Sequence, residues 1–187
     1  MQHTSLTLLE HSIKIVSTKH DPQAFFKKRK GLYVWDSFAD NILPHAKTTK
    51  KGAMFDVASF ELPEDMTDAQ IEAALPKEHI FSETDVCAIV AHLIEAQPNG
   101  EEGPLLTNGY ANLFYTPSRV VRADWFGGVW DVRDWRRGGF RWRQGLRVFS
   151  PATGARTSDL GTGDSSLELE KAVEVVKAAG FRVFKEI

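Results

Sequence analysis

The second half of the chain contains four short segments rich in β-branched and aromatic residues, with turn residues between them. They are ANLFYT (111–116), RVVRADWF (119–126), VWDVRDW (129–135) and GFRWRQGLRVF (139–149). Thr-Pro and Gly-Gly pairs stand between the segments, and such pairs are typical of tight turns. Because consecutive strands joined by tight turns pair antiparallel, the pattern predicts a C-terminal β-meander.

The chain before the meander alternates between strand and helix patterns. Strands are predicted at 12–17, 32–35 and 53–62, and helices at 22–29, 37–43, 68–75 and 82–97. Thr67 and Ser82 stand at the N-cap positions of the last two helices, where a hydroxyl accepts from free backbone amides. Apolar residues of the longest helix recur at the spacing of one helix face, so this helix is expected to pack on the core.

These elements predict one α+β domain over residues 1–187. Its sheet is expected to be mainly antiparallel and packed by two or three helices. The helices at 82–97 and 166–179 are expected to cover the face of the sheet that carries most of the tryptophans. At 187 residues the chain is long enough for one full-sized core, whereas two domains would each be small. Flexible loops are expected at 45–52, 98–109 and 151–165.

Alternation sorts the side chains of the meander onto two faces, because successive strand residues point in opposite directions. One face carries Val121, Ala123, Trp125, Trp130, Val132 and Trp142, and is apolar apart from Asp134 where the second strand ends. The other face carries Arg122, Asp124, Asp131, Arg133, Trp135, Arg141 and Arg143. Three of the four tryptophans are therefore expected in the core, and Trp130 and Trp142 should be largely buried. Only Trp135 is expected among the arginines.

The face that carries the arginines favours a binding function. The formal net charge of the chain is −2, but residues 118–150 contain eight arginines and three aspartates, a net +5. Planar guanidinium groups bind phosphate in a forked geometry, and an exposed aromatic ring can stack a base. We therefore expect a non-catalytic binding module with an anionic partner, either nucleic acid or an acidic protein surface. The candidate binding residues are Arg133, Trp135, Arg136, Arg137, Arg141 and Arg143.

A purely structural explanation of these arginines stays open. Arg122, Arg133 and Arg141 can pair with aspartates on neighbouring strands, and arginine stems cover apolar surface well. The sequence also lacks an RNP motif, a GXXG loop flanked by helices and a zinc finger, which would indicate nucleic-acid binding directly.

The alternative function is a small hydrolase or transferase with its site at the Gly-rich loop 98–110. Its candidate catalytic residues are Glu101 and Glu102, because loops often carry active-site groups. The sequence lacks the glycine fingerprints of nucleotide-binding enzymes and the G-x-S-x-G motif of hydrolases, so catalysis is the less favoured hypothesis. No metal site or cofactor is expected, because no cluster of Cys and His has the spacing of zinc ligands.

The single cysteine, Cys87, excludes an intramolecular disulfide and is expected to be a small buried thiol. The N-terminal sequence lacks the pattern of a secretory signal, and no apolar run approaches the ~18 residues of a membrane span. These features predict a soluble, cytoplasmic protein without a membrane partner. The sequence leaves its oligomeric state open.

Overall fold

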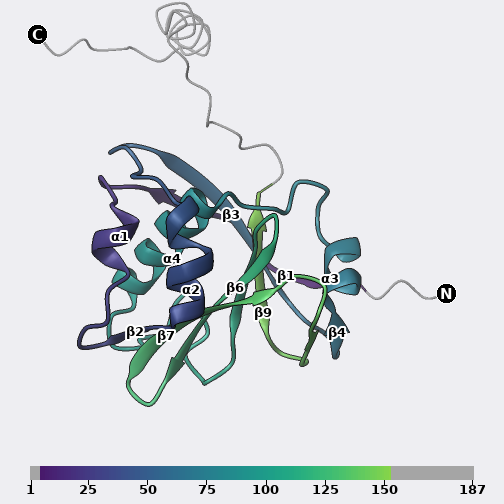
Figure 1. Ribbon diagram of the computed structural model, residues 1–187. Helices are drawn as coiled ribbons and strands as arrows, with labels where there is room; N and C mark the ends of the chain where they lie inside the picture. The colour runs from purple at the N-terminus through teal and green to yellow at the C-terminus, as the bar shows by residue number, and fades with distance from the viewer. Residues whose placement is uncertain (1–4, 153–187) are drawn as a thin grey trace, which may run out of the picture. The chain divides into compact units, whose positions relative to one another are not determined.

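The computed structural model describes residues 5–152 and consists mainly of a seven-stranded sheet with the order β1-β3-β9-β5-β6-β7-β2 (Figure 1). The strands are β1 (Thr7–Val16), β2 (Leu32–Val34), β3 (Met54–Glu61), β5 (Asn112–Tyr115), β6 (Arg119–Phe126), β7 (Val129–Arg136) and β9 (Arg147–Pro151). A separate ribbon pairs β4 (Met66–Thr67) with β8 (Arg141–Trp142). The helices are α1 (Pro22–Phe25), α2 (Asp36–Asn41), α3 (Asp68–Ala74), α4 (Glu83–Ala96) and the 3-10 turn η1 (Leu43–His45).

The α+β class is confirmed, but the expectation of a mainly antiparallel sheet needs correction, because the sheet is mixed. The meander is present where β5, β6 and β7 pair antiparallel in sequence order. However, β9 lies parallel to β5, and β2 lies parallel to β7. Tight turns impose an antiparallel pairing only on consecutive strands, whereas strands far apart in the sequence can pair in either direction.

The helix starts follow the capping signals of the sequence. The Thr67 hydroxyl accepts from the amide of Gln70, whose side chain accepts in turn from the Thr67 amide. The Ser82 hydroxyl accepts from the amide of Asp85 at the start of α4. By contrast, α1 ends at Phe25, four residues earlier than expected, because the chain then turns and pairs Arg29 with Leu32. The helix expected at 166–179 lies outside the described residues, as does nearly all of the loop expected at 151–165.

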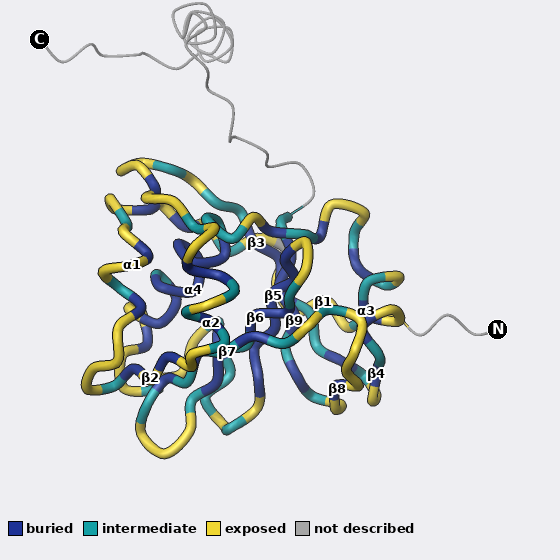
Figure 2. The backbone as a smooth tube through the Cα atoms, viewed as in Figure 1, coloured by how far each residue is buried: buried dark blue, intermediate teal, exposed yellow. Residues whose placement is uncertain are grey.

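Each face of the sheet carries its own hydrophobic core. On the face that we call the helix face, apolar side chains of α4 cluster with Val121, Trp130 and Phe149. On the opposite face, side chains of α3 cluster with Tyr115 and Val120. Figure 2 shows α4 and the central strands buried, whereas the connecting loops are mostly exposed. The sheet is therefore buried on both sides near its centre, although its strands at the β2 side are covered only on the helix face.

The two tryptophans expected in the core are both buried, since Trp130 is 0% and Trp142 is 2% exposed. The expectation that they share a face is wrong, because Trp142 belongs to the core on the opposite face, together with Met66. The chain leaves the main sheet after β7 and turns at Gly138, so the alternation along β7 does not continue into β8.

A buried carboxylate holds this turn in place. Asp68, at the start of α3, is 1% exposed and accepts four hydrogen bonds. One oxygen accepts from the Tyr115 hydroxyl at 2.8 Å and from the Trp142 indole at 2.6 Å. The other oxygen accepts from the amides of Gly138 at 2.8 Å and Phe140 at 3.3 Å. Asp68 thus joins α3, β5 and β8 to the turn that follows β7.

We expect Asp68→Ala to lower the free energy of unfolding by at least about 3 kcal/mol, since each buried donor left without an acceptor costs about 1 to 3 kcal/mol. The matched control is Asp65→Ala, which removes an exposed carboxylate that accepts one hydrogen bond from the Gln144 amide. Its expected loss is below about 1 kcal/mol. Urea unfolding measures both, and equal losses would contradict the role given to Asp68.

Candidate functional site

The faces of β6, β7 and β2 opposite the helix face form a patch of aromatic and charged side chains. The register places Asp124 beside Asp131, and Asp131 beside Tyr33. In the next row Arg122 lies beside Arg133. The backbone amide of Trp35 donates to the carbonyl of Val132, the residue before Arg133. We call these residues, together with Phe126 and Trp135, the aromatic–arginine patch. Its members are Tyr33, Trp35, Arg122, Asp124, Phe126, Asp131, Arg133 and Trp135.

The charges inside the patch neutralise one another. Arg122 binds both carboxylate oxygens of Asp124, at 2.8 and 3.0 Å. Arg133 lies 3.1 Å from Asp131 and 3.6 Å from Asp124. Of the three arginines for which the sequence allowed cross-strand pairing, only Arg133 pairs across strands, with Asp124, whereas Arg122 pairs with Asp124 within β6. These two arginines therefore contribute more to the shape of the surface than to its net charge.

Aromatic rings enclose the Arg133 guanidinium. Its central carbon lies 5.1 Å from the ring centroid of Trp35 and 5.1 Å from that of Trp135, and Arg122 lies 5.4 Å from the Trp135 ring. The Trp35 indole donates to both oxygens of Asp131 at 2.8 Å. Burial raises the pKa of Asp131, whereas the hydrogen bond from Trp35 and the charge of Arg133 act in the opposite direction. Packing and hydrogen bonds together fix the side chains of the patch.

The aromatic rings at the edge of the patch remain open to solvent. Tyr33 is 38%, Trp35 41% and Phe126 71% exposed. Large aromatic rings are usually buried, so three of them on one sheet face are an unusual surface. Along β7 the patch extends from Val129, which pairs with Phe126, to Trp135. This distance is roughly 20 Å at the usual rise per residue of a strand.

The structure brings together only two of the six candidate binding residues, Arg133 and Trp135. Arg137 donates to both carboxylate oxygens of Glu72 at 2.6 and 2.7 Å, and this hydrogen bonding raises the pKa of Arg137. The other three candidates are exposed at different places. Arg136 ends β7, Arg141 donates to the carbonyl of Asp65, and Arg143 lines a hollow described below. The expectation that Arg141 and Arg143 share the face of Arg133 is wrong, because β8 pairs outside the main sheet.

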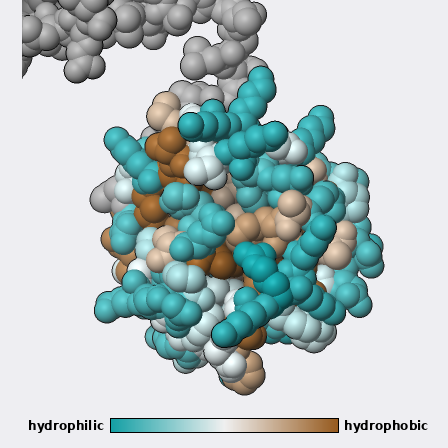
Figure 3. All heavy atoms as spheres, turned by 90° about the vertical axis from the view of Figure 1, so that its left-hand side faces the viewer, coloured by the Kyte–Doolittle hydropathy of each residue, from teal (hydrophilic) through white to brown (hydrophobic). Residues whose placement is uncertain are grey.

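Residues before the meander complete the surface, and the sequence analysis missed them. The run KKRK at Lys27–Lys30 is separated from β2 only by Gly31, and all four side chains are exposed. Residues 14–52 as a whole contain nine lysines and arginines against three aspartates, a net +6. The side of the molecule that carries α1 and β2 is accordingly rich in hydrophilic side chains, with smaller hydrophobic areas between them (Figure 3). Four consecutive basic residues were the signal that could have revealed this surface.

The loop 98–110 is organised by a buried glutamine. The side chain of Gln97 donates to the carbonyls of Glu101 and Leu105, at 2.7 and 3.1 Å, and accepts from the Leu105 amide at 2.9 Å. The Glu101 carboxylate is exposed and accepts from the backbone and side chain of Asn99, which lowers the pKa of Glu101. Glu102 is also exposed. Both candidate catalytic residues therefore lie on the surface of the loop.

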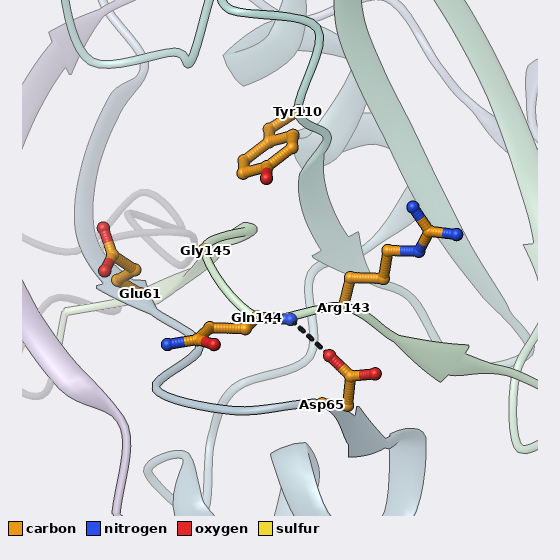
Figure 4. A pocket seen from close by; sticks show the side chains of 6 residues that line it. All are labelled: Glu61, Asp65, Tyr110, Arg143, Gln144 and Gly145. Atoms are coloured by element: carbon orange, nitrogen blue, oxygen red, sulfur yellow. Dashed lines mark hydrogen bonds between the residues drawn. The ribbon is translucent and has the colours of Figure 1, made fainter.

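A hollow of about 420 Å³ lies on another surface of the protein (Figure 4). It is lined by Glu61, Asp65, Tyr110, Arg143, Gln144 and Gly145. Asp65 accepts from the Gln144 amide at 2.8 Å, while Glu61 and Arg143 stand on opposite sides of the hollow. Neither Glu101 nor Glu102 is among the lining residues, so the hollow does not bring the candidate catalytic pair together.

Comparison with known proteins found no match to this chain among protein-family models, curated proteins or solved structures. Within residues 5–152, no group of three or more His, Cys, Asp and Glu side chains is placed to hold a metal ion. None of the helices in the described part of the chain is both long and apolar enough to cross a membrane.

Replacing Trp35 by phenylalanine should raise the pKa of Asp131 further. The indole N–H stabilises the ionised carboxylate, so its removal favours the protonated form. NMR titration of the Asp131 carboxyl carbon measures the shift. Tyr33→Phe is the matched control, because it leaves the indole in place and should leave the pKa unchanged. An unchanged or lower pKa in Trp35→Phe would show that this hydrogen bond is not important.

Cys87 should react with thiol reagents only after unfolding. The side chain is 0% exposed within α4, and burial raises the pKa of the thiol, so the reactive thiolate is scarce at neutral pH. Absorbance with a disulfide reagent should show no reaction in the native protein and one thiol per chain in urea. Rapid modification of the native protein would contradict the burial of Cys87.

Proposed function

We propose that this protein is a non-catalytic binding module that holds single-stranded nucleic acid on the aromatic–arginine patch. The observation that carries the proposal is the exposure of Tyr33, Trp35 and Phe126 around a fixed arginine framework on one sheet face. Aromatic rings on the open face of a sheet stack unpaired bases in several RNA-binding folds. Stacking is worth roughly 1 to 3 kcal/mol per base and tolerates any sequence.

The shape of the patch favours single strands over duplexes. Its rings lie on an open face of the sheet and at its edge, and stacking on them requires bases whose faces are free, as in unpaired strands. Its length of roughly 20 Å is comparable to the shortest sites of single-strand-binding folds, which hold about 4 nucleotides.

An acidic protein surface has less support as the partner. Arg122 and Arg133 are already paired with Asp124 and Asp131, so they offer little free charge to carboxylates. The exposed rings favour a partner that contains planar groups as well as anions, and nucleic acid has both. The hydrolase or transferase alternative also has less support, because Glu101 and Glu102 are exposed and lie outside the hollow.

Fluorescence anisotropy with a labelled single strand of about 15 nucleotides tests the proposal. The wild-type protein should bind at low salt, and Trp35→Ala should weaken binding roughly 5- to 100-fold, the equivalent of one lost stacking contact. The salt dependence should not change, because Trp35 carries no charge. Tyr110→Ala is the matched control, since this ring is 48% exposed but lines the hollow instead of the patch.

Two results would overturn the proposal. The first is the absence of binding to single strands at low salt. The second is binding that Trp35→Ala and Tyr110→Ala leave equally strong. Thermal unfolding of both variants checks that any loss of binding is not a loss of folding.

A further inference from the structure

A basic turn stands at one end of the aromatic–arginine patch. Arg29 and Leu32 exchange backbone hydrogen bonds of 3.0 Å, so Lys30 and Gly31 form a tight turn, in which Gly31 has a φ of 81°. The carbonyl of Gly31 accepts from the Trp130 amide at 2.9 Å and thereby ties the turn to the start of β7. The Lys28 ammonium lies 4.6 Å from the ring centroid of Tyr33. The turn is therefore next to the open rings of the patch.

The tip of the β6–β7 hairpin lies at the same end. Phe126 pairs with Val129 across Gly127 and Gly128, whose φ values are 61° and 83°. By alternation Phe126 belongs to the same face as Asp124, and it is the most exposed large apolar residue of the described chain, at 71%. Together with Tyr33 and Trp35, Phe126 makes the exposed aromatic surface of the patch continue to the hairpin tip.

The hairpin tip is anchored from the helix face. The Trp125 ring packs edge-on against Trp130 with centroids 5.5 Å apart. A Cβ atom at Gly100 would approach the Trp125 ring to 2.3 Å, so the loop backbone fits against this ring only through a glycine. The Trp130 indole also donates to the carbonyl of Gln97 at 2.7 Å. These contacts hold Phe126 in a defined position beside the basic turn.

We propose that Lys27, Lys28 and Lys30 bind the phosphates of a single strand while Phe126 stacks an unpaired base beside them. This inference rests on the proposed function and locates its phosphate contacts. The arginines inside the patch are neutralised by Asp124 and Asp131, so we assign the attraction of a polyanion to the turn, where Lys27 and Lys30 are exposed and the Lys28 ammonium lies 3.8 Å from the exposed carboxylate of Asp36. Arg29 supports the turn instead, since its guanidinium lies 4.5 Å from the Phe25 ring centroid and binds the Phe25 carbonyl.

The salt dependence of binding is the measurement that isolates the lysines. Each phosphate contact on a single strand contributes about 0.7 to the slope of log affinity against log salt. Changing Lys27, Lys28 and Lys30 together to glutamine should therefore flatten the slope by about 2. The matched control changes Lys47, Lys50 and Lys51 to glutamine, three exposed lysines of the loop that pairs with His20 through Thr49. This control removes the same charge and should leave the slope nearly unchanged.

A second pair of variants tests Phe126. Phe126→Ala should weaken binding of a labelled single strand roughly 5- to 100-fold without a change in the salt slope. Met54→Ala is its control, because Met54 is 61% exposed and lies on β3, which β9 and β5 separate from β6 in the sheet. An unlabelled duplex of the same sequence should compete less well than the single strand, because its bases are not free to stack. Thermal unfolding should be unchanged in all four variants, since every substituted side chain is exposed.

The outcomes separate this inference from the proposed function. If the wild-type protein does not bind single strands, the proposed function fails, and the inference fails with it. If it binds but the two lysine triples flatten the slope equally, the phosphate contacts assigned to Lys27, Lys28 and Lys30 are wrong, although the patch can still bind. Equal competition by duplex, or no effect of Phe126→Ala, would overturn the stacking role of Phe126. Binding to phosphatidylserine vesicles without binding to oligonucleotides would overturn both proposals.

Discussion

The buried carboxylate of Asp68 determines where the chain goes after β7. By accepting from Gly138, Phe140 and Trp142 it turns the chain away from the main sheet and into the ribbon with β4. A fourth meander strand would occupy the free edge of β7. Because β8 leaves, that edge is available to β2, which pairs with β7 in parallel and brings Tyr33 and Trp35 to the surface. The aromatic–arginine patch is thus a consequence of the turn that follows the C-terminal end of β7.

Within the patch, rigidity and charge come from different residues. Arg122 and Arg133 are paired with aspartates and packed on indole rings, so they stabilise the surface without leaving a strong field. The carboxylate of Asp124 is buried, and packing against aromatic rings further limits the freedom of both arginines. The positive charge next to the patch comes from the exposed lysines of the turn, within the segment 14–52 that holds a net +6.

Features set by neighbouring residues could be predicted from the sequence. The Thr67 and Ser82 caps and the alternation along β6 and β7 are local, and the structure has them as expected. Features set by distant residues could not. The Trp142 indole finds its acceptor 74 residues away at Asp68, and the Trp35 indole finds Asp131 96 residues away. For this reason the sequence placed Arg133 and Trp135 on one face but missed Tyr33 and Trp35, and it grouped Arg137 with them although Glu72 binds it.

The pairing of arginines with aspartates is compatible with binding by the patch. A surface whose side chains are already fixed loses little conformational entropy when a partner binds, and this preorganisation increases affinity. A free arginine would add Coulomb attraction but would first have to be ordered. In this chain Arg133 is held between two indole rings, while the lysines at 27–30 remain exposed. The affinity of the patch should therefore depend on stacking, and the dependence on salt should come almost entirely from the basic turn, which is why the two can be separated by mutation.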